Sequence, residues 1–208
     1  MNLLVLGATG GIGIEIVRQS ITRGHAVTAF IRRPERLRPF DGRISIATGD
    51  MLNASELARA MRGQDAVLSA FGPRVPIAST DAHLLRHFAA SLTNAMNEAN
   101  VRRAIVVSTA FLFKDALLPP AYLFGRLFFP SVVTDATGME AMLCASGLDI
   151  AIVRPPQLTD KPHTGKFRVR EGHLPAFGFS IPRADVADFM ISTAENGAFA
   201  KSVVGVSS

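Results

Sequence analysis

The chain has 208 residues, 48% of them hydrophobic, so it can bury a sizeable core without metals or disulfides. A net charge of +5 raises the possibility of nucleic-acid binding, but the arginines are scattered outside two short groups and no nucleic-acid-binding motif accompanies them. The single cysteine, Cys144, excludes an intramolecular disulfide, and its apolar surroundings predict a buried, unreactive side chain. With a first apolar stretch too short for a signal peptide, we expect a cytoplasmic protein.

Apolar, β-rich runs alternate with helical patterns, which is typical of βαβ units in a parallel sheet. The runs alternate little between apolar and polar residues, as expected for strands covered on both faces. We expect strands at 3–6, 26–31, 44–48, 66–69, 104–108 and 149–154, and helices at 11–23, 55–62, 81–100, 133–146 and 183–195. The predicted fold is α/β, with a Rossmann-type, doubly wound parallel sheet in one domain over residues 1–208.

Two stretches interrupt this alternation. Residues 116–133 are strongly apolar but contain three prolines and one arginine, which predicts a lid or a packed interface rather than a membrane span. Residues 157–180 are rich in glycine and proline, so we expect an irregular insert after the sixth strand. In a doubly wound fold this insert lies near the carboxyl ends of the strands, on the substrate side.

A glycine-rich turn joins the first predicted strand to the first predicted helix. One glycine there can take a positive φ, a second lets a pyrophosphate approach the amides, and a third allows close packing of helix and strand. The helix N-terminus adds unpaired N–H groups and the positive end of a dipole. The sequence therefore predicts a dinucleotide-binding site that begins with Gly7, Thr9, Gly10, Gly11, Ile12 and Gly13.

Further motifs along the chain are Gly49-Asp50, Ser108-Thr109, Ser146-Gly147-Leu148-Asp149, Val153-Arg154-Pro155-Pro156 and Arg183-Ala184-Asp185-Val186-Ala187. With these motifs and the glycine turn, the chain resembles an atypical short-chain dehydrogenase/reductase. Within this family it is similar to the NmrA-like proteins and to biliverdin reductase B, also called flavin reductase. The resemblance implies additional cofactor contacts at Asp50, Met51, Ala70, Phe71, Gly72, Ser108 and Pro155.

Arg32 and Arg33 follow the second predicted strand, where NAD-binding folds usually place an acidic residue for the ribose 2′-hydroxyl. A carboxylate would repel a 2′-phosphate, whereas a guanidinium can bind it through two hydrogen bonds and stack on adenine. We therefore expect NADP(H) as the cofactor. A solvated basic loop is the alternative interpretation of the two arginines, and an ordinary turn is the alternative for Asp50.

Many members of the family use a Tyr-x-x-x-Lys pair to exchange a proton with the substrate. In this chain the matching positions are Val132 and Ala136, and the only tyrosine is Tyr122, which is followed four residues later by an arginine. The candidate catalytic residues are therefore Ser108, Gln157 and Tyr122. Gln157 stands where the biliverdin reductase subgroup has a histidine. Tyr122 can equally be an interface or lid residue, and Ser108 a hydroxyl that bonds the backbone.

Two functions fit these residues. The first is an NADPH-dependent oxidoreductase that transfers a hydride to a small planar acceptor such as a flavin or quinone, which tolerates missing acid residues because solvent can supply the proton. The second is a non-catalytic NADP(H)-binding redox sensor similar to the NmrA-like proteins. The expected partner is a small molecule, with a protein partner or a homodimer as open alternatives, and no nucleic acid or membrane is expected.

Two further groups of polar residues receive structural interpretations. His83 and His87 are four residues apart on a predicted helix, but no matching third ligand is evident, so we expect surface histidines and no metal site. Asp185 and Asp188 fall in the first turns of the last predicted helix, where we expect them to compensate the helix dipole.

Overall fold

The computed structural model describes residues 1–72, 83–112 and 130–208. The strands are β1 (Asn2–Leu6), β2 (Ala26–Ile31), β3 (Ser45–Thr48), β4 (Ala66–Ser69), β5 (Arg103–Val107), β6 (Asp149–Arg154), β7 (Gln157–Thr159), β8 (Arg168–Glu171), β9 (Ser180–Pro182) and β10 (Val203–Ser207). The α-helices are α1 (Gly11–Thr22), α2 (Ala54–Met61), α3 (Leu84–Ala99), α5 (Pro130–Ala145) and α6 (Arg183–Asn196), and the 3-10 helices are η1 (Pro34–Phe40) and η3 (Ala110–Leu112).

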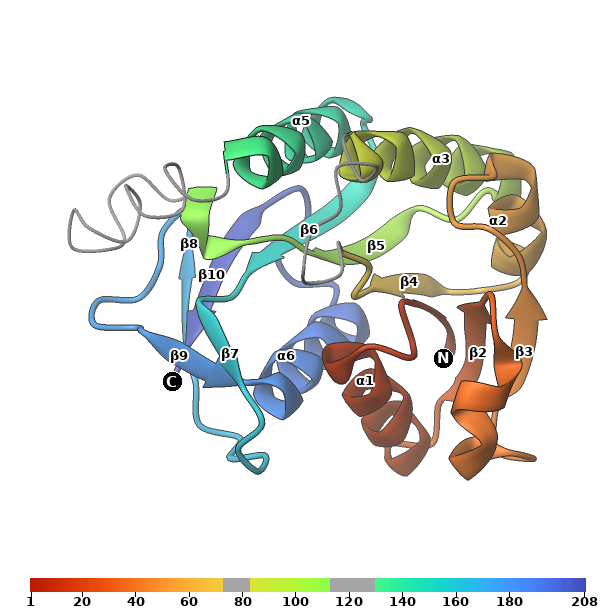
Figure 1. Cartoon of the computed structure of the whole chain (residues 1–208), viewed down its shortest axis with the longest axis horizontal. Coiled ribbons are helices and arrows are strands. Elements are labelled where there is room, and N and C mark those ends of the chain that lie inside the picture. The colour runs from red at the N-terminus through yellow and green to blue at the C-terminus, as the bar shows by residue number, and fades with distance from the viewer. Residues whose placement is uncertain (73–82, 113–129) are drawn as a thin grey trace.

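Eight of the strands form one sheet in the order β3-β2-β1-β4-β5-β6-β10-β8 (Figure 1). Every described pairing in this sheet is parallel except that of β8 with β10. The order reverses direction between β1 and β4, which is the switch point of a doubly wound Rossmann sheet. The predicted α/β fold in a single domain is confirmed.

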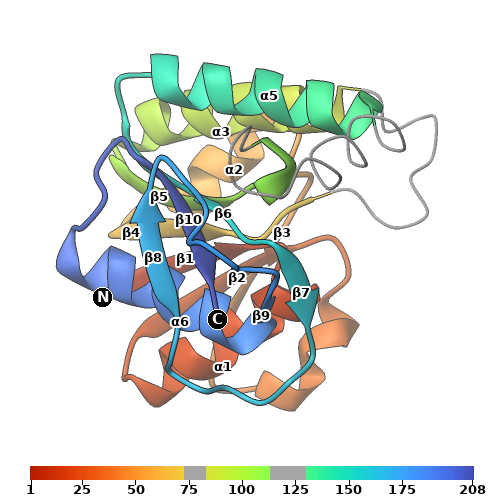
Figure 2. The ribbon, with the colours of Figure 1, turned by 90° about the vertical axis from the view of Figure 1, so that its left-hand side faces the viewer.

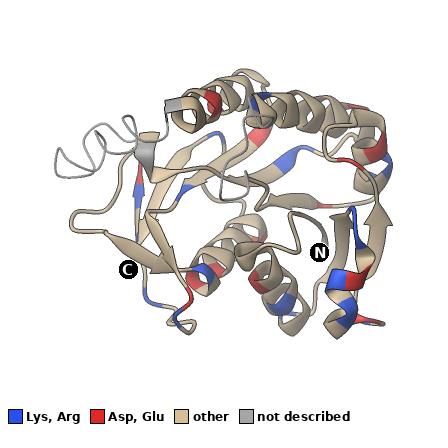
Figure 3. Cartoon of the chain, viewed as in Figure 1, with Lys and Arg blue, Asp and Glu red and all other residues tan. Residues whose placement is uncertain are grey.

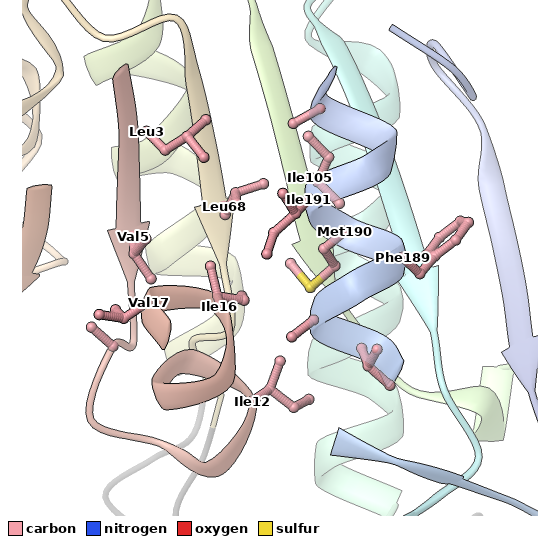
Figure 4. Packing of buried hydrophobic residues seen from close by; sticks show 14 of the residues in the cluster. Leu3, Val5, Ile12, Ile16, Val17, Leu68, Ile105, Phe189, Met190 and Ile191 are labelled. Carbon is pink, nitrogen blue, oxygen red and sulfur yellow. The ribbon is translucent and has the colours of Figure 1, made fainter. Parts of the chain in front are cut away.

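Helices cover both faces of the sheet. α2, α3 and α5 pack on one face, and α1 and α6 on the other (Figures 1 and 2). Side chains of β1 alternate between the two layers: Leu3 and Val5 belong to the α1/α6 core, and Leu4 and Leu6 to the α2/α3/α5 core. Figure 4 shows the first of these cores, with apolar residues of α1 and α6 facing the sheet. Because β1 is buried on both faces, its sequence is a continuous apolar run.

Local signals explain where several helices begin and end. Asn53 begins α2 by accepting hydrogen bonds at Oδ1 from the backbone N–H groups of Ser55 (3.1 Å) and Glu56 (3.2 Å). The glycines that follow α1, α2 and α5 adopt left-handed φ angles of 78°, 77° and 73°, as expected for the residue after a helix: Gly24, Gly63 and Gly147.

The start of α3 has no cap of its own and depends on α5. Asp135 of α5 accepts hydrogen bonds from the backbone N–H groups of Leu85 (2.7 Å) and Arg86 (3.3 Å). The Asp135 side chain is 8% exposed, so its charge is held in a largely dry site by the helix N-terminus and by the Arg86 guanidinium, 3.4 Å away. This contact fixes the beginning of α3 relative to α5.

The main errors of the sequence interpretation lie after the sixth strand. Residues 157–180 are not an irregular insert throughout, because β7 pairs with β9 in a small separate sheet and β8 pairs with β10. The strand β10 itself was not predicted. β7 and β9 have only three residues each, and β8 is exposed along its whole length. None of these three strands therefore carries a clear hydrophobic pattern.

Cys144 corrects a second expectation, because its side chain is exposed rather than buried. The inward face of α5 is formed by Ala136, Met139 and Leu143, at the spacing of one helix face, and Cys144 is turned away from it. The thiol is nevertheless not primed for nucleophilic attack, because partial burial and the neighbouring Glu140 carboxylate raise its pKa against the opposing effect of a nearby arginine.

Two expectations concern a segment outside the described residues. The predicted lid or interface at 116–133 falls largely there, and so does Tyr122. Within the described ranges, no helix is both long and apolar enough to cross a membrane.

Candidate cofactor site

A cavity of about 670 Å³ lies at the switch point, where the chain leaves β1 and β4. Its volume is in the range of small-molecule and cofactor pockets. Ten residues that the sequence analysis assigned to the cofactor line it: Gly7, Thr9, Gly10, Arg32, Arg33, Asp50, Met51, Ala70, Phe71 and Gly72. Four lining residues were not predicted: Ile31, Arg36, Leu52 and Leu84.

The glycine turn forms one wall of the cavity, and its backbone leaves no room for side chains. Gly7 has a φ of 75°, and a β-carbon there would lie 2.7 Å from the backbone oxygen of Ala70. A β-carbon on Gly13 would lie 2.1 Å from the backbone oxygen of Gly7. Gly10 occupies the N-cap position of α1 without any side-chain capping bond, so the first amides of the helix stay open to an anion.

Three arginines form another part of the wall. Arg32 and Arg33 follow β2, and Arg36 lies on η1; all three side chains are exposed and line the cavity. Charged residues gather at this end of β2 and along η1 (Figure 3). Across the described parts of the chain, none of the three guanidinium groups forms a salt bridge. The site therefore offers unpaired positive charge to a ligand. The spacing of Arg36 three residues after Arg33 is the signal that could have added it.

Asp50 belongs to the turn that precedes α2 and also lines the cavity. Its Oδ1 accepts a hydrogen bond from the backbone N–H of Leu52 (3.0 Å), and its own N–H donates to Glu56 Oε2 (2.7 Å). These contacts fit the ordinary turn that was kept as an alternative, because the carboxylate is used to shape the chain. One of its oxygens is engaged in this way, and the turn places Met51 and Leu52 at the cavity as well.

The loop after β4 and the start of α3 complete the cavity. The ring of Phe71 lies 4.7 Å from that of Phe88 on α3, which holds the loop against the helix. Leu84, the first residue of α3, faces the cavity and owes its position to the contact of α3 with Asp135. The α2/α3/α5 layer therefore positions the apolar side of the site.

Three predicted cofactor residues of the glycine turn and its surroundings do not line the cavity: Gly11, Ile12 and Gly13. Ile12 is 7% exposed and belongs to the core beneath the turn. Gly11 and Gly13 allow close packing, Gly11 against the side chain of Arg183 and Gly13 against the turn itself. None of the three lines the cavity, but their backbone N–H groups are the first amides of α1, next to Gly10, which does line it.

Ser108, Pro155 and Gln157 also lie off the cavity, at the carboxyl ends of the adjacent strands β5 and β6. The backbone N–H of Ser108 donates to Val153 (2.7 Å), and the carbonyl of Pro155 accepts from Ala110 (3.2 Å), so backbone hydrogen bonds join the two strand ends. The Ser108 hydroxyl is buried and has no hydrogen-bond partner among the described residues. A buried hydroxyl without a partner is costly, and the described residues supply none for Ser108.

Gln157 begins β7, and its side chain is exposed. Its backbone N–H donates to the carbonyl of Phe179 (3.3 Å), so the insert continues directly from the ends of the central strands. Ala136, one of the positions where the family has its proton-transfer pair, is buried in the core of α5 and has no polar group. Its counterpart Val132 is partly buried on the same helix.

The acidic residues of α6 do more than compensate its dipole. Asp185 is fully buried and accepts hydrogen bonds from the backbone N–H groups of Thr164 (2.8 Å) and Gly165 (3.0 Å) and from the Thr164 hydroxyl (2.6 Å). Asp188 pairs with His163 and with Arg23 of α1. Asp185 lies in the first turn of α6 as expected, and in addition the two carboxylates fasten the insert and α1 to α6, which the sequence did not indicate.

His83 and His87 are both exposed on the surface at the start of α3, as the sequence analysis expected. Their ring centroids are 6.5 Å apart. Within the described residues, no group of three or more histidine, cysteine, aspartate or glutamate side chains is arranged to hold a metal ion.

The fold and the cavity define a dinucleotide-binding protein of the Rossmann type. The sequence model of the NAD(P)H-binding family matches residues 7–197, so the chain belongs to this family. The expected resemblance to short-chain dehydrogenases/reductases is confirmed at the level of family and fold.

Relatives and solved structures agree with this assignment. The chain is 30% identical over 199 residues to an uncharacterised chloroplastic protein of Arabidopsis thaliana, a match that covers 91% of this chain and 70% of the relative. A short-chain dehydrogenase/reductase of Veillonella parvula in complex with NADP superposes with a TM-score of 0.83, at 21% identity and with coverage of 100% and 94%. ChuY, an anaerobilin reductase of Escherichia coli O157:H7, superposes with a TM-score of 0.79, at 25% identity and with coverage of 99% and 96%.

Proposed function

We propose that the protein is an NADPH-dependent reductase that transfers a hydride to a small planar acceptor such as a flavin or a quinone. The observation that carries the cofactor preference is the wall formed by Arg32, Arg33 and Arg36, which line the cavity without salt bridges to the described residues. Three neighbouring positive charges repel one another, and a 2′-phosphate would relieve this repulsion through charge-assisted hydrogen bonds.

The other cofactor contacts follow from the cavity walls. The open amides at the start of α1 suit a pyrophosphate, and the glycine turn lets it approach because no β-carbon intervenes. The loop after β4 offers Phe71 and backbone groups to the nicotinamide half. When bound, NADPH supplies the hydride.

The acceptor would lie beside the ends of β5 and β6. We assign the Ser108 hydroxyl, which lacks a partner among the described residues, to a hydrogen bond with the acceptor, and Gln157 to a second polar contact. Neither group protonates a strongly basic oxygen, and Val132 and Ala136 cannot do so either. A quinone or flavin suits this site, because hydride transfer from NADPH and one proton from solvent complete its two-electron reduction.

The names of similar proteins support a reductase without defining its acceptor. ChuY is described as acting on anaerobilin. A relative in Streptomyces griseus, 26% identical over 185 residues, is named as a reductase of (4-alkanoyl-5-oxo-2,5-dihydrofuran-3-yl)methyl phosphate; the match covers 79% of this chain and 65% of the relative. These two acceptors differ greatly, so the acceptor class rests on the residues of this chain.

Cofactor preference is tested by calorimetry with NADPH and NADH. We expect NADPH to bind the unmodified protein more tightly, and Arg32→Ala to weaken NADPH binding about tenfold to a hundredfold, the range expected for one charged hydrogen bond. NADH binding should change little. Arg38→Ala is the matched control, because Arg38 is an exposed arginine of η1, the helix that carries Arg36, but does not line the cavity. Equal affinities of the unmodified protein for both cofactors would contradict the proposal.

Turnover is tested by mixing the protein with NADPH and a panel of flavins, quinones and small carbonyl compounds. We expect acceptor-dependent loss of nicotinamide absorbance, slowed in a Ser108→Ala, Gln157→Ala double variant whose NADPH affinity is unchanged. The missing proton donor at Val132 and Ala136 also suits a redox sensor. Tight NADPH binding without oxidation by any acceptor, together with association to another protein that differs between NADPH and NADP⁺, would replace the reductase by that sensor.

A further inference from the structure

The side chain of Arg183 lies against Gly11 of the glycine turn. A β-carbon placed on Gly11 would be 2.5 Å from Cδ and 2.8 Å from Nε of Arg183. Gly7 and Gly13 of the same turn are confined by backbone atoms, whereas Gly11 is confined by this arginine. The start of α1 therefore has a cationic side chain from α6 packed directly on it.

This placement is held by contacts between α1 and α6 on several levels. Gln19 of α1 donates from Nε2 to the carbonyl of Ala184 (2.8 Å), next to Arg183 in the chain. About one helical turn after Gln19, Arg23 forms salt bridges with Asp188 and with Glu195, whose Oε2 lies 2.9 Å from Arg23 Nη1. The two helices lie side by side on one face of the sheet (Figures 1 and 4). Arg183 is consequently brought to Gly11 by the packing of α6.

The guanidinium has one ion-pair partner among the described residues, and that pair is weak. Arg183 Nη1 lies 2.6 Å from Oδ1 of Asp160 on the insert after β7, and the side chain of Asp160 is 90% exposed and that of Arg183 29%. Exposed ion pairs of this kind contribute little to stability, because water screens them and two side chains must be ordered. Arg183 can therefore exchange Asp160 for a more strongly charged partner at small cost.

We propose that Arg183 is a further cofactor-binding residue, which binds the pyrophosphate of NAD(P)H at the start of α1 and exchanges its contact with Asp160 for it. A pyrophosphate carries two negative charges, and the open amides of α1 offer it only partial positive charge. The cavity arginines follow β2, on the other side of α1 from α6 (Figure 1), which suits the ribose end of the cofactor. Arg183 supplies a full positive charge from the α6 side of α1, away from the cavity arginines.

The exchange connects the cofactor site to the insert. Asp160 precedes Thr164 and Gly165, which are fastened to α6 by the buried carboxylate of Asp185. When Arg183 turns to the pyrophosphate, the segment around Asp160 loses one contact while the anchor at Asp185 remains. Occupation of the phosphate site is thereby communicated to the beginning of the substrate-side insert.

The test is calorimetry of the Arg183→Met and Asp160→Asn variants of the full chain. Methionine keeps an apolar stem on Gly11 and removes the charge, so we expect NADPH and NADH to bind about tenfold or more weakly, and by the same factor, since both contain the pyrophosphate. Adenosine 2′-monophosphate, which lacks a pyrophosphate, should bind as before. Asp160→Asn removes the competing carboxylate and should tighten both dinucleotides roughly two- to fivefold.

Arg18→Met is the matched control, because Arg18 is an exposed arginine of α1 paired with Glu15, and its loss should leave both affinities unchanged. Arg183→Lys keeps a charge and should recover part of the affinity. The two proposals fail separately: equal binding of NADPH and NADH by the unmodified protein contradicts only the preference for the 2′-phosphate. Unchanged affinities in Arg183→Met, or weakening of NADPH alone, overturn the role of Arg183. If Asp160→Asn binds the dinucleotides more weakly, Arg183 does not exchange Asp160 for the pyrophosphate. This result can be obtained even if Arg183→Met does not fold.

Discussion

The glycines of the glycine turn meet different physical requirements. Gly7 needs a left-handed φ and also faces the loop after β4, Gly13 leaves no space between the helix and the turn, and Gly11 accommodates the stem of Arg183. Backbone atoms cannot move aside without breaking the turn, whereas a long side chain can change its rotamer. The three positions should therefore differ in how they respond to the same substitution.

The Gly13→Ala variant is the sharpest test of this difference. A β-carbon 2.1 Å from the backbone oxygen of Gly7 forces the first turn of α1 away from β1, and we expect a loss of several kcal/mol or more of folding stability. Gly24→Ala is the control, because Gly24 has open space and a φ of 78°, so only about 1 kcal/mol is expected. Urea unfolding followed by circular dichroism measures both. Native stability in Gly13→Ala would show that the turn is looser than described.

Residue by residue, the sequence predicted the site best where a single position follows a strand end. Arg32 and Ala70 follow β2 and β4 directly, so topology alone brings them to the cavity. Leu84 could not be found in this way, because its position depends on the packing of α3 against α5. Arg183 is separated from Gly11 by most of the chain, and only the packing of α6 on α1 joins them.

At the scale of elements, charged contacts fasten α1, α6 and the insert together. Asp188 lies at their centre, because its carboxylate contacts Arg23 of α1 and lies 2.8 Å from Nε2 of His163 in the insert. Burial by itself would raise the pKa of Asp188, but the hydrogen bonds and charges of His163 and Arg23 outweigh it and lower the pKa below its usual value of 3.8. The ionised carboxylate is therefore favoured in the folded state.

This shift predicts a defined pH dependence of stability. A carboxyl group whose pKa is lowered by folding stabilises the protein above its unfolded pKa, and the stabilisation is lost as the pH falls through the lower folded value. We expect Asp188→Asn to lower the unfolding free energy at pH 7, and this difference from the unmodified protein should shrink below about pH 4. Denaturant unfolding between pH 3 and 7 measures it. A difference that grows on acidification would contradict the assignment.

Burial alone did not decide which elements could be predicted, because β3 has no buried residue and was predicted, whereas β10 has four buried residues and was missed. β2, β4 and β6 are short apolar runs, and they begin and end where the sequence pattern placed them. β8 has no buried residue, and β7 and β9 depend on pairing with each other across the insert. Pairing between distant short segments leaves no periodic signal in either segment, which is why these strands were missed.

For the whole molecule, the candidate cofactor cavity draws its walls from both layers of the fold. The glycine turn is supported by the α1/α6 core, and Leu84, Phe71 and Met51 by the α2/α3/α5 core. Unfolding of either layer removes part of the site. A ligand that binds this cavity therefore binds the native state and not the unfolded chain, and it must stabilise the entire domain by mass action.

The resulting prediction concerns thermal unfolding with and without cofactor. NADPH at a hundred times its dissociation constant should add about 2.7 kcal/mol to the unfolding free energy, which corresponds to a rise in Tm of roughly 5–10 °C for a domain of this size. NADH at the same concentration should raise Tm less, and Arg32→Ala should remove most of the difference between the two cofactors. Circular dichroism at several cofactor concentrations tests this. Equal shifts with NADPH and NADH would contradict a 2′-phosphate site at the arginines, and no shift with either would contradict cofactor binding in this cavity.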